Sequence, residues 1–222
     1  MPKLGLIVLD LDETTLENIF DFYEAYCTAL RIHNEDCPGF DEFMVMFNEN
    51  KLHEKIPLHV NQVYFWKTFR KLYASKHSWL KKGLREFLYY VKNLGVRIVI
   101  ISGRESPSYG IWFDLRKHGI DEYVDELYTM WDLEILRGYE EFLFDKSYLV
   151  NHARRRLGVQ GETVCIGDYV TDYYSCVKAR GIFIGINSEE SRNTALKKAG
   201  VKYVARDFTD VLVILSELGL LS

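Results

Sequence analysis

Short apolar runs alternate with longer segments of helical periodicity along most of the chain. Leu4–Leu9 is the first such run and ends at a charged residue. A run of this kind predicts a strand buried on both faces, as in the centre of a parallel sheet. We expect further buried strands at 96–101, 163–167 and 182–186, a weaker strand at 124–130, and a short edge strand at 202–205.

Segments with apolar residues at helical spacing lie between these strands, and several end at a glycine. The helices predicted in this part of the chain cover residues 83–94, 107–118, 147–157, 191–199 and 209–218, and a further helix follows the strand at 163–167 and runs to about residue 179. Residues 131–145 have no clear pattern. Strands that alternate with helices of this length predict an α/β fold, with a parallel sheet and right-handed crossovers.

The stretch after the first strand differs, because residues 17–82 show only helical patterns. Helices are expected at 17–32, 41–50 and from Pro57 to about residue 74, and their aromatic stripes predict a small bundle with its own core. We therefore predict a core domain of residues 1–16 and 83–222, into which a helical domain of residues 17–82 is inserted.

Composition narrows the function classes. The 222 residues carry a net charge of -4, so bulk charge does not favour a nucleic-acid partner. No apolar window approaches the roughly 20 residues of a membrane span, and the apolar start is too short for a secretory signal. We expect a cytoplasmic protein of one large domain, or of a core with an insertion.

The cysteines and histidines do not form a metal or disulfide pattern. The four cysteines lack CxxC spacing, and a disulfide framework is not expected in an intracellular chain of this size. Cys165 lies in an apolar run and is interpreted as a small buried hydrophobe. Whether Cys27 approaches Cys37 is left open by their spacing. The six histidines form no spaced cluster, which argues against zinc.

Candidate chemistry gathers where predicted strands end. Asp10 and Asp12 follow the first strand, Ser102 ends the second, and Asp168 follows a later one, while Lys146 precedes a helix. Each of these residues alone has an ordinary structural explanation, such as a turn, a helix cap or a solvated surface group. Together they lie where open α/β sheets bind ligands. Two close carboxylates also repel, so a site that keeps both ionised needs a cation.

In this order, the residues resemble the motifs of the haloacid dehalogenase-like superfamily. Asp10-Leu-Asp12-Glu-Thr14 matches its Asp-x-Asp-x-Thr motif, and Ser102 matches the hydroxyl that ends a second strand. Lys146 matches the third motif, and Gly167-Asp168-Tyr-Val-Thr-Asp172 matches Gly-Asp-x-x-x-Asp. The resemblance implies a Rossmann-like parallel sheet flanked by helices, with the helical insertion as an all-helical cap domain. Glu13, where the family's phosphatases often have a small residue, and Ser147, where the family often has proline, depart from the pattern.

The resemblance also implies roles for these residues. Asp10 would be the nucleophile and Asp12 the general acid and base. Mg²⁺ would be bound by the carboxylates of Asp10 and Asp168 and by the backbone carbonyl of Asp12. Ser102 and Lys146 would hold phosphoryl oxygens.

Other residues are assigned supporting roles. Thr14 would orient the loop or the acid/base carboxylate, and Asp172 would orient Lys146 or a metal-bound water. Gly103 and Arg104 are assigned to substrate binding. For Arg104, contact with the phosphate or a substrate carboxylate stands beside a surface salt bridge as an equal alternative.

The activity implied is that of a Mg²⁺-dependent phosphatase acting on a small phosphorylated metabolite through an aspartyl-phosphate. A phosphomutase or phosphotransferase would use the same residues, with a hydroxyl in place of water as acceptor. A non-catalytic protein that binds a phosphorylated ligand is the alternative from a different class, and it would be favoured by a missing nucleophile or acid. The sequence leaves monomer and homodimer equally open, and no nucleic acid or membrane partner is expected.

Overall fold

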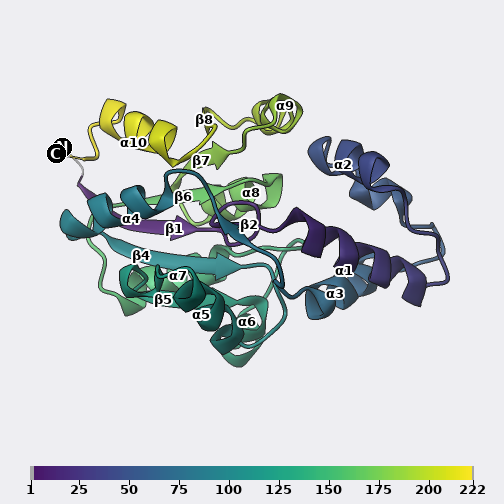
Figure 1. Cartoon of the computed structure of the whole chain (residues 1–222). Helices are drawn as coiled ribbons and strands as arrows, with labels where there is room; N and C mark the ends of the chain where they lie inside the picture. The colour runs from purple at the N-terminus through teal and green to yellow at the C-terminus, as the bar shows by residue number, and fades with distance from the viewer. Residues whose placement is uncertain (1–2, 222) are drawn as a thin grey trace.

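A six-stranded parallel sheet forms the centre of the protein (Figure 1). The computed structural model describes residues 3–221. The strand order is β5-β4-β1-β6-β7-β8, so the first strand lies in the interior of the sheet. The bounds of these strands are β1 Leu4–Leu9, β4 Arg97–Ser102, β5 Glu126–Thr129, β6 Glu162–Gly167, β7 Ile182–Ile186 and β8 Tyr203–Ala205.

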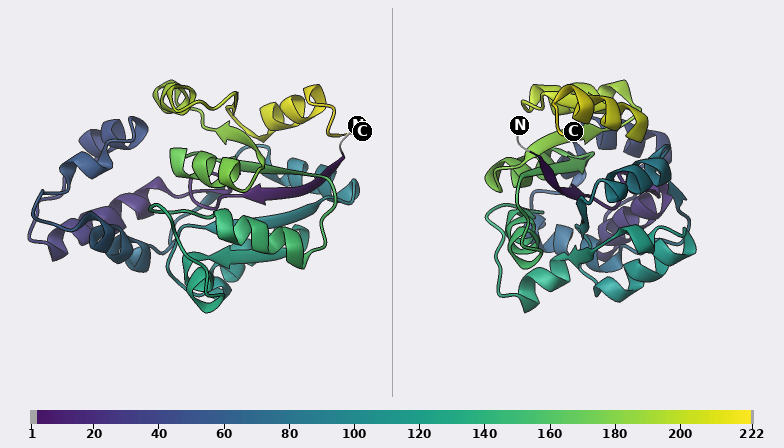
Figure 2. Two further views of the ribbon diagram at one scale, coloured as in Figure 1. Left: turned by 180° about the vertical axis from the view of Figure 1, so that it is seen from behind. Right: turned by 90° about the vertical axis from the view of Figure 1, so that its left-hand side faces the viewer.

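Helices cover both faces of the sheet, as the opposite views in Figures 1 and 2 show. One face packs against α4 (Leu84–Asn93), α5 (Ser108–Lys117) and α10 (Phe208–Glu217). The other packs against α6 (Met130–Ile135), α7 (Ser147–Arg156), α8 (Val170–Lys178) and α9 (Glu190–Lys198). A short 3₁₀ turn, η2, spans Asp121–Tyr123. The predicted α/β class with a Rossmann-like parallel sheet is therefore confirmed.

The apolar runs form strands because alternate side chains enter two separate cores. In β1, Ile7 and Leu9 pack into the core on one face, whereas Leu6 and Val8 pack into the core on the other. All four side chains are buried. This two-sided burial is the reason that the strand has no polar side between residues 4 and 9.

Three helices and a 3₁₀ turn lie beyond the carboxyl ends of the strands (Figure 1). They are α1 (Ile19–Ile32), α2 (Phe40–Asn48), η1 (Leu52–Lys55) and α3 (Gln62–Leu72), and we call them together the helical segment. The segment has a core of its own that is rich in aromatic rings. Phe22 is central to it, since its ring lies 4.6 Å from that of Phe69 and 5.2 Å from that of Phe47, centroid to centroid.

Two short strands that the sequence analysis did not predict connect the helical segment to the sheet. β2 (Leu16–Glu17) pairs antiparallel with β3 (Trp79–Leu80). The expectation of no strand between residues 17 and 82 was therefore wrong. Two residues are too few to show a period, and this pairing arises because the chain leaves and re-enters the core at one place.

Most other predicted elements are present with shifted ends. The largest shift is in α3, which begins at Gln62 and not at Pro57. The stretch without a pattern, 131–145, overlaps a helix, α6, whose first turn is closed by a capping box between Thr129 and Asp132. Within residues 3–221, no helix combines the length and apolar character that crossing a bilayer requires.

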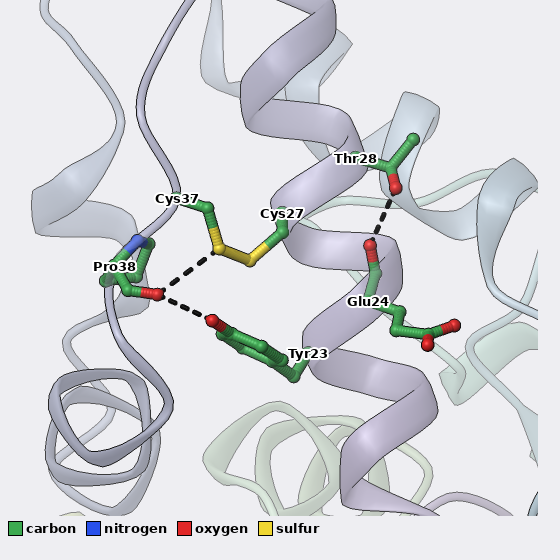
Figure 3. The surroundings of a disulfide bond; sticks show 6 residues. All are labelled: Tyr23, Glu24, Cys27, Thr28, Cys37 and Pro38. Atoms are coloured by element: carbon green, nitrogen blue, oxygen red, sulfur yellow. Dashed lines mark hydrogen bonds between the residues drawn. A yellow bond between two sulfur atoms is a disulfide. The ribbon is translucent and has the colours of Figure 1, made fainter.

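The helical segment contains a disulfide bond between Cys27 and Cys37 (Figure 3). This corrects the expectation that the chain has no disulfide framework. Because α1 ends at Ile32 and the chain turns back, the two Cα atoms lie 4.9 Å apart, within the range for a disulfide. The hydroxyl of Tyr23 donates to the carbonyl of Pro38 at 2.8 Å beside it. The start of α2 is thus fixed to α1 by one covalent bond and one hydrogen bond.

Removing this disulfide should lower stability. We expect the Cys27→Ser/Cys37→Ser variant to lose about 2–3 kcal/mol of unfolding free energy, because the crosslink restricts a short loop in the unfolded chain. Urea unfolding with and without reductant measures this. The reductant should lower the stability of the wild type by the same amount and leave the double variant unchanged. A wild type that is insensitive to reductant would show that the bond does not contribute to stability.

Candidate active site

The topology of the sheet brings three of the predicted site residues together. β1 pairs in parallel with β4 on one side and with β6 on the other. The carboxyl ends of these strands deliver Ser102, Asp10 and Asp168 to one edge of the sheet. The backbone N–H of Asp10 donates to the carbonyl of Ile166 at 2.9 Å, so β1 and β6 stay paired up to the first aspartate.

Three carboxylates converge at this edge. One oxygen from each of Asp10, Asp168 and Asp172 lies within 4.8 Å of the others. Carboxylate oxygens are hard donors and suit Mg²⁺, and three anions in a buried place favour a divalent cation. The residues therefore fit the predicted metal, with Asp172 close to the two carboxylates predicted to bind it. Asp12 is not part of this group of side chains, and the sequence analysis assigned only its backbone carbonyl to the metal.

Lys146 lies between two of these aspartates. It occupies the position just before α7, where its backbone N–H donates to the hydroxyl of Ser175 at 2.9 Å. Its ammonium group donates to Asp172 at 2.7 Å and also to Asp10. Burial works against the charged ammonium, but the two carboxylates outweigh it and raise the pKa of Lys146. The predicted third motif therefore supplies a fixed positive charge to the site.

Burial also changes the titration of the aspartates. It raises the pKa of Asp10 well above its ordinary value, although the Lys146 ammonium lowers it. Burial raises the pKa of Asp168 as well, against the lowering effect of Arg192. The nearby carboxylates Asp172 and Asp12 add to the rise at Asp10. Each carboxylate thus gains from any further positive charge placed between them.

Arg192 is a buried cation that the sequence analysis missed. It projects from α9 with a side chain that is 0% exposed, and it donates to Asp168 at 3.1 Å. The same guanidinium donates to the carbonyl of Phe47 and, at 2.7 Å, to the side chain of Asn50. It stacks between the rings of Phe47 and Tyr169. Arg192 therefore connects the sheet edge to α2, and nothing in the local sequence pattern distinguishes it from a solvated helix residue.

Asp12 is bound by residues from both parts of the protein. Arg104 donates to its carboxylate through two nitrogens, one of them at 3.0 Å, and Asn18 donates to it at 2.7 Å. Tyr73 of the helical segment donates to Asn18 at 2.9 Å, and its ring lies beneath the Arg104 guanidinium. The Arg104 guanidinium is therefore in a buried pair with Asp12 and not in a surface salt bridge. Its contact with a phosphate or a substrate carboxylate stays a prediction.

The remaining predicted residues are close to the carboxylates. The hydroxyl of Thr14 donates to Asp168 at 3.3 Å, and Ser102 is buried with its hydroxyl accepting from the backbone N–H of Arg104 at 3.1 Å. A Cβ atom added at Gly103 would lie 3.1 Å from the Phe144 ring, so a side chain here would crowd the site.

Glu13 has an unusual backbone. Its φ of 60° lies in the left-handed region, where a residue with a Cβ atom is strained. The backbone N–H of Asn18 donates to its carboxyl group at 2.7 Å. Burial raises the pKa of Glu13 to about 8, although this hydrogen bond lowers it. The turn between the two parts of the protein is thus fixed by Glu13 and Asn18.

These residues surround a cavity of about 310 Å³ between the sheet edge and the helical segment. Six of the predicted residues line it, whereas Thr14, Ser102 and Arg104 are buried beside it. The six are Asp10, Asp12, Gly103, Lys146, Asp168 and Asp172. An anion that enters the cavity would meet Lys146, and an electrophilic atom would meet the Asp10 carboxylate.

The comparisons with known proteins agree with this arrangement. A family model described as haloacid dehalogenase-like hydrolase matches residues 4–180. No curated protein sequence matches the chain.

Solved structures of similar fold cover nearly the whole chain. A predicted phosphatase from Clostridium acetobutylicum is 14% identical, with a TM-score of 0.73 over 97% of this chain and 99% of that one. A predicted phosphoglycolate phosphatase from Haemophilus somnus is 18% identical, with a TM-score of 0.68 over 96% and 99%. A protein assigned as a β-phosphoglucomutase from Thermotoga maritima is 16% identical, with a TM-score of 0.64 over 96% and 99%. At these identities the likeness shows a shared fold.

Loss of the Arg192 side chain should be strongly destabilising. We expect Arg192→Met to lower the unfolding free energy by about 3 kcal/mol, because it leaves Asp168 buried without its cation. Arg206→Met is the matched control, since Arg206 pairs with Asp210 on the surface with a side chain that is 77% exposed. Chemical unfolding compares the two. Equal, small shifts of the unfolding midpoint would show that the buried pair has no structural role.

Proposed function

The chain belongs to the haloacid dehalogenase-like hydrolases, a family of enzymes, and we propose that it is a Mg²⁺-dependent phosphatase of a small phosphorylated metabolite. The observation that carries the proposal is the position of Asp10. Its carboxylate lines the cavity, beside the ammonium of Lys146 and two further aspartates. This is the arrangement that an anionic nucleophile needs in order to approach an anionic phosphate.

In the first step, a carboxylate oxygen of Asp10 attacks phosphorus, and the ester P–O bond breaks. The leaving oxygen takes a proton from Asp12, which acts as general acid. Lys146 and Ser102 bind phosphoryl oxygens and stabilise their charge. The products of this half-reaction are the free alcohol and an acyl phosphate on Asp10, the aspartyl-phosphate.

In the second step, water attacks the phosphorus atom of this acyl phosphate. Asp12 takes a proton from the water, the bond to Asp10 breaks, and inorganic phosphate leaves. Arg104 and Asn18 bind both oxygens of Asp12. Asp12 must therefore break some of these contacts to reach the leaving oxygen, and arrival of the substrate supplies the competing partner.

The carboxylates of Asp10 and Asp168 and the backbone carbonyl of Asp12 would hold Mg²⁺, with Asp172 near enough to orient its ligands. When bound, Mg²⁺ supplies the positive charge that offsets repulsion between the nucleophile and the phosphate. Thr14 and Arg192 both donate to Asp168 and so orient its carboxylate.

The helical segment is proposed as the cap over this site, within an inserted domain of residues 17–82. Its support is the position of α1 to α3 beyond the strand ends, and the contribution of Trp66, Phe69 and Tyr73 to the cavity wall. A cytoplasmic location is also part of the proposal, because phosphorylated metabolites occur there. The Cys27–Cys37 disulfide weighs against it, since such bonds are rare in most cytosolic proteins.

Asp10→Asn should abolish turnover without unfolding the protein, because an amide is a poor nucleophile. We expect phosphate release to fall about a thousandfold or more, and chelation of Mg²⁺ to have a comparable effect on the wild type. A panel of phosphate esters assayed with and without Mg²⁺ measures both. Asp36→Asn, on the surface, is the control and should keep full activity. Near-normal activity of Asp10→Asn would refute the nucleophile assignment.

Asp12→Asn should lower the rate of hydrolysis of alkyl phosphates more than that of aryl phosphates. With alkyl phosphates we expect a loss of about 10²–10⁴-fold, the range for general acid catalysis. Aryl phosphates should lose less in the first step, since their leaving groups need less protonation. Pre-steady-state bursts of alcohol or phenol release report this step directly. Equal losses with both classes would count against the acid role.

A further inference from the structure

The wall of the cavity opposite the carboxylates is mostly apolar. A volume of about 310 Å³ is at the lower end of the roughly 300–1,000 Å³ typical of small-molecule sites, so the cavity has room for more than a phosphate. Nine aromatic or aliphatic side chains line it: Phe22, Phe47, Leu52, Trp66, Phe69, Tyr73, Leu143, Phe144 and Tyr169.

The cavity offers no unpaired cation to a second acidic group of the substrate. Among the described lining residues, Lys146 and Arg192 are the two with permanent positive charge. Lys146 is bound by Asp10 and Asp172, and Arg192 by Asp168 and the backbone of Phe47. A substrate carboxylate against the apolar wall would therefore have no free permanent cation beside it, which is unfavourable. A chain of hydroxyl groups would also lose hydrogen bonds to water against this wall.

Phe144 is fixed in the wall by an ion pair between α3 and the loop that precedes Lys146. Arg70, with a side chain that is 1% exposed, binds Glu140 through two hydrogen bonds of 3.0 and 2.8 Å. Glu140 also accepts from the backbone N–H of Phe144 at 2.8 Å. The Arg70 guanidinium lies over the Phe144 ring, 4.1 Å from its centroid.

The backbone of Phe144 is strained, with a φ of 64°. A residue with a Cβ atom adopts this conformation only where its surroundings enforce it, and such positions are common at ligand sites. Here the enforcing group is Glu140, itself fixed by Arg70. The result is a ring whose place does not depend on the substrate.

Phe144 lies between the phosphate end of the cavity and the helical segment. Phe144 comes two residues before Lys146, which is proposed to bind the phosphate. On one side, its ring is so near Gly103 that a Cβ atom at that glycine would lie 3.1 Å from it. On the other side its ring meets Trp66 edge to face, with centroids 5.8 Å apart. The organic part of a phosphate ester would therefore contact Phe144 first and Trp66 beyond it.

We propose that the substrate is a phosphate monoester of an alcohol with an uncharged aromatic or similarly apolar body, and that Phe144 and Trp66 determine this specificity. The proposal rests on the proposed phosphatase function and specifies its substrate class. Small phosphorylated acids such as phosphoglycolate, and polyhydroxylated sugar phosphates, are poor substrates on this account.

Alkyl phosphates of unactivated alcohols test the proposal without a bias from the leaving group. The assay compares 2-phenylethyl phosphate with ethyl phosphate, glycerol phosphate and phosphoglycolate. We expect the phenyl ester to have a kcat/KM about 10–100-fold higher than ethyl phosphate, mostly through a lower KM, because a ring of this size gains that much from burial. Glycerol phosphate and phosphoglycolate should not exceed ethyl phosphate.

Three variants test which residues cause the preference for the phenyl ester. Phe144→Leu and Trp66→Leu should each reduce the ratio of kcat/KM for the phenyl ester to kcat/KM for ethyl phosphate severalfold, and circular dichroism reports whether each variant is folded. Tyr64→Leu removes an aromatic ring from the exposed side of the same helix and should leave the preference unchanged. A preference that survives both cavity variants would refute the roles of Phe144 and Trp66.

The outcomes distinguish this inference from the function on which it rests. Phosphate release that depends on Asp10 but does not favour the phenyl ester refutes the substrate class and leaves the phosphatase function standing. If no ester releases phosphate, the function fails, and calorimetry then tests the cavity by itself. Asp10→Asn should still bind 2-phenylethyl phosphate at least tenfold more tightly than ethyl phosphate, and equal binding would refute the inference.

Discussion

Buried carboxylates that converge at one edge of the sheet are the constraint on which the rest of the structure depends. Asp10, Asp168 and Asp172 repel one another, and burial makes each charge costly. Lys146 offsets part of that cost at Asp10 and Asp172, and Arg192 offsets part of it at Asp168. Three anions against two fixed cations leave room for a metal ion, which is why the site fits hydrolytic chemistry on phosphate better than a purely structural role.

The same charges connect the helical segment to the sheet. Arg192 binds both Asp168 and the backbone of α2, and Arg104 binds Asp12 and lies over the ring of Tyr73. Arg70 on α3 binds Glu140 in the loop that precedes Lys146. A movement of the helical segment would therefore change the surroundings of both Asp12 and Asp168. Access to the cavity and the arrangement of its charged groups are physically coupled.

The sequence allowed the sheet and the carboxylates to be predicted, because their signals are local. An apolar run such as 4–9 predicts a buried strand by itself, and parallel strands then bring Asp10 and Asp168 together. Arg192, Phe144 and the Cys27–Cys37 bond were not predicted, because each depends on residues distant in space or on the path of a turn. Arg192 in particular reads as a solvated helix residue until α2 is placed against it. The two-residue strands β2 and β3 were too short to show any period.

The central claim is that Asp10 carries the phosphoryl group during turnover. Rapid quenching of the enzyme with a phosphate ester and Mg²⁺, followed by borohydride reduction and peptide mass analysis, tests it most directly. A phosphorylated aspartate is reduced to homoserine, so the account predicts homoserine at position 10, and only when substrate is present. Rapid phosphate release with Asp10 unmodified, or with the modification at another carboxylate, would contradict the account.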